Sequence, residues 1–340
     1  MLHPARSHRH QATLVIGSLM LCAFASLLFA GMTGSVAIAP AELPEALRQL
    51  ARGEAGTLAA SLLELRAGRA LTAFVTGGAL ALAGVMMQAL LRNPLADPYV
   101  LGISAGASVG ALLALLLMAA AVVVDLAALG GAVAVSMLLY LLARRDLRSG
   151  LAAEGGSSML LLTGVILSSA CMALVTLMLS VAPEGRLRSM VFWMIGDLSG
   201  APVRLASWLV LGAALVYALR SARAMNIVAL HAESAATLGI RVGRLRKGLF
   251  LVSGVLTASA VTSAGSIGFV GLIVPHACRF AFGPDHRVLV PAAVLAGGSF
   301  LVLCDTLARS VIAPQQLPVG AITAIIGAPV FLYQLHRLRR

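Results

Sequence analysis

Long apolar runs separated by short polar intervals constrain the fold of this 340-residue chain more than any other feature. Sixty per cent of the residues are hydrophobic and only 11% are charged, whereas about a quarter are charged in a typical soluble domain. A helix needs about 17–25 apolar residues to cross the roughly 30 Å hydrocarbon core of a bilayer. The sequence therefore predicts an all-α polytopic membrane protein with about ten transmembrane helices. The predicted spans are residues 12–33, 67–91, 100–122, 126–143, 158–182, 204–221, 245–265, 267–282, 287–306 and 318–335.

The distribution of basic residues predicts the orientation of these spans. If the N-terminus is cytoplasmic, 17 of the 25 Arg and Lys residues fall on the cytoplasmic side, as the positive-inside rule expects. The net charge of +12 is then a topological signal, and we do not expect nucleic acid as a partner. Ten spans also place the C-terminus inside, and two related five-helix halves would have inverted topology.

The stretch NPLADPYVLGISAGASVG interrupts the apolar pattern after the second predicted span. Pro94 and Pro98 remove two backbone donors and disfavour helix just before them, which predicts a shaped turn. Gly102, Gly106 and Gly110 recur every four residues, so they align on one helix face. Small residues on one face let a second helix backbone approach closely. The stretch thus predicts a turn followed by a tightly packed transmembrane helix.

The polar segment 225–248 lies on the predicted cytoplasmic side and contains the Ala-rich sequence HAESAATLGI. It predicts one or two short helices, with Glu233 near the start of the first, where its charge suits the helix dipole, and Gly239 at its end. From composition, such a helix fits a groove on a partner protein and an anionic lipid surface equally well. The chain contains no G-x-x-x-x-G-K-[ST] motif, so ATP must be bound by another subunit.

Four stretches resemble the FecCD/BtuC-like permease subunits of type II ABC importers, which take up ferric siderophores, haem and cobalamin. They are GALALAGVMMQALLRNPLADPYVLGISAGASVG, LRSMVFWMIGDLSG, AESAATLGI and the long C-terminal stretch that begins SIGFVGLIVPHACRF. The resemblance covers about residues 60–335 in collinear order. It implies one permease domain over residues 1–340 in a bacterial inner membrane, acting as a homodimer with two cytoplasmic ATPase subunits and a periplasmic binding protein. It implies no enzymatic activity, no metal and no cofactor on this chain, with ATP held by the ATPases.

The same resemblance assigns roles to residues at matching positions. It implies docking of the periplasmic binding protein by Arg66, Arg69 and Arg309, coupling to the ATPase by Glu233, Ser234, Ala235, Ala236 and Gly239, and a cytoplasmic gate of Asn93, Pro94, Leu95, Ser157 and Ser158. One departure is that the family usually has Arg-x-Pro-Arg where this chain reads Arg66-Ala67-Gly68-Arg69. The two arginines are kept, whereas the rigid turn residue is not.

The cargo is the least determined part of this prediction. We expect haem, with a ferric siderophore or cobalamin as alternatives, because the NPLADPYVLG region most resembles the haem branch. Arg188, near Met190 on the outer side, could attract a porphyrin propionate through a charge-assisted bond, and the two residues are assigned to the substrate pathway. Arg188 could equally anchor the chain at the interface beside Trp193.

Two other functional classes remain as remote alternatives. Gly102-Ile103-Ser104-Ala105-Gly106 matches the G-x-S-x-G pattern of a serine nucleophile, which would suggest an intramembrane protease, although that motif requires a strand–turn–helix context. An ion-coupled secondary carrier would place ionisable groups within the spans. Asp305 and His276 are the candidates for that role.

Overall fold

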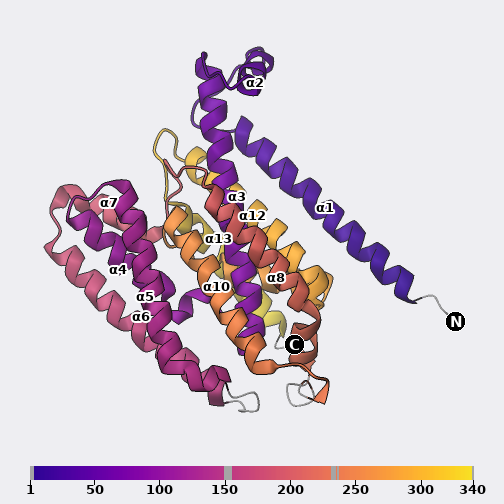
Figure 1. The fold of residues 1–340 in the computed structure, drawn as a ribbon. Helices are drawn as coiled ribbons and strands as arrows, with labels where there is room; N and C mark the ends of the chain where they lie inside the picture. The colour runs from indigo at the N-terminus through magenta and orange to yellow at the C-terminus, as the bar shows by residue number, and fades with distance from the viewer. Residues whose placement is uncertain (1–3, 149–154, 231–234, 236, 339–340) are drawn as a thin grey trace.

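The computed structural model describes residues 4–148, 155–230, 235 and 237–338, and in this part of the chain every regular element is helical (Figure 1). The helices are α1 (Pro4–Met32), α2 (Leu43–Ala51), α3 (Leu58–Leu91), the short 3₁₀ helix η1 (Pro98–Leu101), α4 (Ile103–Leu116), α5 (Ala121–Arg148), α6 (Gly155–Val181), α7 (Glu184–Ile195), α8 (Leu205–Leu230), α10 (Val242–Ala264), α11 (Val270–Phe282), α12 (His286–Ser310) and α13 (Val319–Leu338).

Among the described residues, seven helices are long and apolar enough to cross a membrane: α1, α3, α5, α6, α8, α10 and α12. The shorter apolar helices α4, α11 and α13 coincide with the other three predicted spans. The all-α polytopic architecture is thereby confirmed. The exact number of ten crossings stays a prediction, because the apolar parts of the three shorter helices are only 10–17 residues long. The inverted relation of two halves also stays a prediction.

Helix boundaries depart from the predicted spans where capping, and not hydrophobicity, sets them. α3 begins nine residues before the predicted start at residue 67, since Thr57 caps it by accepting a hydrogen bond from the Ala60 backbone N–H at 3.3 Å. Pro275 lies inside α11, which continues through it as a single helix. The amphipathic helix α2 and the helix α7 were not predicted at all, because they connect spans and are too short to cross.

α3 lies at the centre of the molecule and is buried along most of its length. It packs against α1, α8, α10, α11 and α12, while α4, α5 and α6 pack on one another as a second group. α10 contacts α5 as well as α3 and so joins the two groups. In Figure 1 the N-terminal end of α1 and the C-terminal end of α13 lie towards the lower part of the view, whereas α2 lies at the top and α7 at the left, above the middle.

The glycine ridge of α4 performs the close packing that the sequence predicted. A Cβ atom added at Gly110 would lie 1.9 Å from the Ala127 carbonyl oxygen, and one at Gly106 would lie 2.5 Å from that of Gly131. Ala127 and Gly131 both belong to α5. Since real Cβ atoms do not approach so closely, the contact between α4 and α5 requires glycine at these positions.

Candidate functional site

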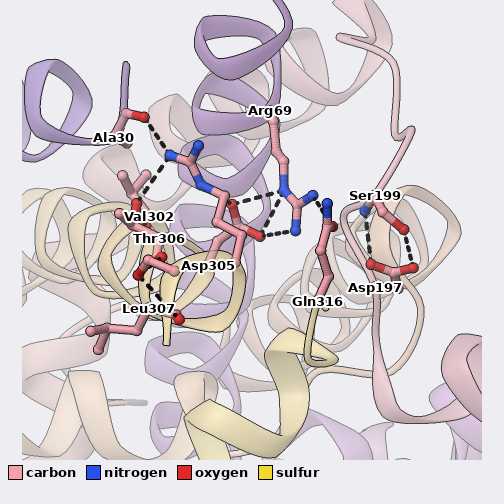
Figure 2. Close-up of polar contacts among 11 residues, drawn as sticks. Ala30, Arg69, Asp197, Ser199, Val302, Asp305, Thr306, Leu307 and Gln316 are labelled. Atoms are coloured by element: carbon pink, nitrogen blue, oxygen red, sulfur yellow. Dashed lines mark hydrogen bonds and ion pairs between the residues drawn. The ribbon is translucent and has the colours of Figure 1, made fainter. Parts of the chain in front are cut away.

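The three arginines predicted to dock a binding protein lie where α1, α3 and α12 meet. Figure 2 shows Arg69 with its partners Asp305 and Gln316. Arg69 donates hydrogen bonds from Nε and Nη2 to both carboxylate oxygens of Asp305, at 2.8–3.0 Å. Its Nη1 donates to Oε1 of Gln316 at 2.8 Å, on the exposed loop after α12. Arg69 is therefore held by a bidentate ion pair on one side and reaches an exposed residue on the other.

Arg66 and Arg309 are turned further inward. Arg309 donates to the carbonyl oxygen of Ala30 and places its Nε 3.7 Å from Asp305, with only 7% of its side chain exposed. Arg66 donates to the carbonyl oxygens of Met32, at 3.2 Å, and Val36. These contacts join the end of α1 to α3 and α12, so the arginines also hold three helices together. Their role in docking stays a prediction.

The predicted gate turn follows directly after α3. Oδ1 of Asn93 accepts a hydrogen bond from the Leu95 backbone N–H at 2.9 Å, which makes an Asx turn. Pro94 and Leu95 are exposed. Asp97 then caps η1 by accepting from the Tyr99 N–H at 2.8 Å, and burial raises the pKa of Asp97 to about 6 against this hydrogen bond. The turn thus presents an apolar tip, and its role as a gate stays a prediction.

The other predicted gate residues, Ser157 and Ser158, lie in the first turns of α6. Their side chains fall outside the part of the chain that is described, so their contribution to a gate stays a prediction.

The predicted coupling segment is described only in part, because Glu233, Ser234 and Ala236 lie outside the described residues. Ala235 is fully buried, and its carbonyl oxygen accepts a hydrogen bond from the Ile240 N–H at 3.0 Å. Gly239 has a φ of +77°, the left-handed conformation that ends a helix. The predicted stop at Gly239 is confirmed. Leu238, which the sequence reasoning passed over, leaves 66% of its surface exposed beside this stop.

The two residues assigned to the substrate pathway have opposite environments. Met190 is fully buried within the core, so it does not line an open path in this conformation. Arg188 is exposed, and its guanidinium carbon lies 5.4 Å from the centre of the Phe192 ring. The two residues were assigned together because they are close in the sequence, but side chains two positions apart on a helix point in different directions.

Arg188 contributes to a cavity of about 380 Å³ at the junction of α7 with the loop that follows it. The lining residues are Arg188, Ser189, Phe192, Trp193, Asp197, Ser199 and Gly265. Two aromatic rings beside hydroxyl and charged groups form a surface that suits part of a large, flat, polar-edged chelate. Phe192, Trp193 and Asp197 were not singled out as site residues, although all three belong to the family-like stretch LRSMVFWMIGDLSG.

Two of the residues proposed for the rival functions, Ser104 and Asp305, are engaged in structural contacts. Ser104 opens helix α4, not a strand–helix turn, and its hydroxyl bonds that of Ser266 at 2.8 Å. Asp305 is paired with arginines, as described above. His276 is buried one position after Pro275, inside α11. None of these environments resembles an activated nucleophile, and Asp305 is committed to a stable ion pair.

Comparisons with known proteins agree with this architecture. The chain is 39% identical over 282 residues to the vitamin B12 import system permease protein BtuC of Escherichia coli O9:H4 (strain HS), covering 82% of this chain and 84% of that protein. It is 42% identical to the cobalamin import system permease protein BtuC of Halobacterium salinarum, covering 80% and 72%. These proteins are transport permeases and not enzymes.

Solved structures show the same fold. The inward-facing structure of a metal-chelate type ABC transporter matches with a TM-score of 0.80 and 28% identity, covering 96% of this chain and 99% of that one. PsaBC from Streptococcus pneumoniae matches at a TM-score of 0.55 and 17% identity, which is a likeness of fold alone. The model of the FecCD transport family matches residues 19–337. The chain therefore belongs to the FecCD transport family and is a permease subunit of a type II ABC importer.

Proposed function

We propose that this permease imports cobalamin, as one half of a homodimer that works with two ATPase subunits and a substrate-binding protein. The observation that carries the cargo assignment is the identity of 39% and 42% to cobalamin permeases from a bacterium and from an archaeon. The haem expectation has no support among these relatives, whereas its cobalamin alternative does. The resemblance of one short stretch to a haem branch is outweighed by identity over four fifths of the chain.

The mechanism that fits this fold is alternating access. Closure of the ATPase pair moves the segment around Ala235–Gly239, and the helices change between outward-open and inward-open states. A shift from mostly closed to mostly open requires about 5 kcal/mol of differential binding, which ATP at two coupled sites can supply. The Asx turn at Asn93–Leu95 then serves as the inner plug, and Arg69 with its neighbours serves as the outer docking point.

The cavity beside α7 supports a corrinoid more than a porphyrin dicarboxylate. The Arg188 guanidinium lies over the Phe192 ring, and it has Asp197 as a neighbour in the cavity lining. A bound propionate would bring a second negative charge into a lining that already holds the Asp197 carboxylate. The amide side chains of a corrin ring, in contrast, can hydrogen-bond to Ser189 and Ser199 without bringing further charge.

Reconstitution of the permease with its ATPase and binding protein in proteoliposomes tests the cargo. Cobalamin, haem and a ferric siderophore are offered in turn, and a hydrolysis-deficient ATPase serves as the control. We expect ATP-dependent uptake of cobalamin alone. Uptake of haem without cobalamin would overturn the cargo and leave the importer class intact. Uptake driven by a proton gradient without ATPase subunits would favour a secondary carrier.

A further inference from the structure

The last turns of α8 contact the beginning of α12 through the side-chain amide of Asn226. Its Nδ2 donates a hydrogen bond to Oδ1 of Asp285 at 2.6 Å. Its Oδ1 accepts the backbone N–H of His286 at 3.0 Å and lies 2.6 Å from Nδ1 of the same residue. One amide therefore engages the residue that caps α12 and the first residue of that helix at the same time.

We call the contacts of the Asn226 side chain with Asp285 and His286 the clamp. The clamp lies close to the coupling segment. Asn226 lies four residues before Leu230, where α8 ends and the chain enters the coupling segment. α12 begins at the clamp and extends for 25 residues, carrying Asp305 and Arg309 in its last two turns. A single helix thus connects the clamp with the arginine cluster at the opposite end of α3, against which it packs.

The clamp is more than a helix cap, because α12 already has one. Oδ1 of Asp285 accepts the Arg287 backbone N–H at 3.0 Å, which is the usual N-cap hydrogen bond. Partial burial raises the pKa of Asp285, but the hydrogen bonds from the Arg287 backbone and the Asn226 amide, with the charge of Arg287, lower it overall. Asp285 is therefore ionised at neutral pH, and its bond to Asn226 is charge-assisted.

We propose that Asn226 is a positioning residue that transmits displacement of the coupling segment to α12. Movement of the end of α8 pulls the start of α12 through bonds to both the carboxylate and the backbone of that helix. The proposal rests on the proposed coupling role of the segment around Ala235–Gly239.

Two single changes disrupt the clamp, and an exchange of its two polar side chains tests whether it can be rebuilt. Asn226→Ala deletes all three contacts, and Asn226→Asp places two carboxylates against each other. The double change Asn226→Asp with Asp285→Asn restores the bond between the two side chains, because the new amide at position 285 donates to the new carboxylate at 226. It gives up the cap bond from the Arg287 N–H, since one oxygen of Asp285 accepts both bonds in the wild type. Asp285→Asn alone measures the cost of losing that cap bond. Ser207→Ala is the matched control, since Ser207 also bonds α8 to α10, through Ser263 at 3.1 Å, at the opposite end of α8.

The first readout is cobalamin moved per ATP hydrolysed in proteoliposomes. Both single changes at Asn226 should lower it about fivefold or more, the range of ordinary coupling between sites, while affinity for the ATPase stays unchanged. The double change should restore it, and Ser207→Ala should match the wild type. A merely structural clamp would lower the unfolding temperature without changing this ratio. A normal ratio in Asn226→Ala, or a double change that folds but fails to restore the ratio, would overturn the proposal.

A second readout does not depend on the cargo. A nitroxide label at the exposed position Val311, just after α12, in a background without native cysteines, should move when ATP is added to the complex. Asn226→Ala should reduce that movement and the double change should restore it. Absence of cobalamin uptake with a normal label response would defeat the cargo assignment alone. A label response that Asn226→Ala leaves unchanged would defeat the clamp, whatever the cargo is.

Discussion

Arg69 and Asp305, separated by 236 positions in the chain, form a bidentate ion pair that ties α3 to the C-terminal part of α12. The side chains are only 13% and 3% exposed. Both arginine nitrogens face carboxylate oxygens in the geometry that makes such pairs strong. Asp305 is therefore the residue around which two of the three predicted docking arginines, Arg69 and Arg309, are organised, and not the proton site of a carrier.

Loss of this ion pair should destabilise the protein far more than loss of an exposed one. Arg69→Ala leaves a buried carboxylate without its main partner, which costs about 3–5 kcal/mol. The control is Arg204→Ala, whose pair with Asp125 is 27% exposed on both sides and is worth about 0–1 kcal/mol. Thermal unfolding in detergent measures both. Equal shifts in the two variants would contradict the central place given to Asp305.

The docking role can be tested without opening the buried pair. Gln316→Glu places a negative charge beside the outward nitrogen of Arg69 and should weaken binding of the substrate-binding protein about twofold to fivefold, as expected for one exposed pair. The loss should shrink as salt rises, because salt screens exposed charges. Gln49→Glu, on α2, introduces the same charge away from the cluster and is the control. Unchanged affinity at low salt would count against docking at Arg69.

Exposed Leu238 should form part of the surface that the ATPase subunit covers. Leu238→Asp adds a charge where an apolar contact is expected, so the purified complex should lose ATPase subunits while the permease keeps its unfolding temperature. Leu47→Asp on α2 is the matched control, because Leu47 is 51% exposed on a helix far from the coupling segment. Retention of the ATPase by the Leu238 variant would place the coupling surface elsewhere.

The close packing of α4 on α5 should not tolerate a methyl group. Gly110→Ala forces the helices apart and should cost about 1–3 kcal/mol, as overpacking usually does. Gly212→Ala in α8 is the control, since an added Cβ there meets nothing within 4 Å and alanine is the better helix former. The two unfolding temperatures should therefore move in opposite directions or differ clearly. A stable Gly110 variant would refute this helix contact.

Asp97 should make stability depend on pH below neutrality. Its pKa is raised from 3.8 to about 6 in the folded protein, so the folded state binds the proton more tightly than the unfolded state does. The stabilisation from protonation is complete below pH 4 and is lost as the pH rises to 6. Asp97→Asn keeps the cap to Tyr99 but cannot ionise, so its stability relative to the wild type should increase between pH 4 and 6 and stay constant above. A pH-independent difference would show that Asp97 ionises normally.

The amino-acid sequence alone determined the helical, membrane-spanning architecture, the turn at Asn93, the stop at Gly239 and the glycine face at Gly106 and Gly110. These features depend on neighbouring residues: apolar length forces helix in a bilayer, and proline, glycine and asparagine act on the backbone where they stand. Helix ends outside the apolar runs were missed, because capping at Thr57 carries no hydrophobic signal.

Only the tertiary structure decided which polar groups meet and which side chains are buried. The burial of Arg309, the pairing of Arg69 with Asp305 and the clamp of Asn226 on Asp285 all join segments far apart in the chain. The sequence also could not identify Met190 as a core residue. In a membrane protein the lipid-facing and protein-facing sides of a helix are both apolar, so the periodicity that marks the buried face of a soluble helix is weak. Contacts between helices, set by small residues and a few buried polar groups, determine the site.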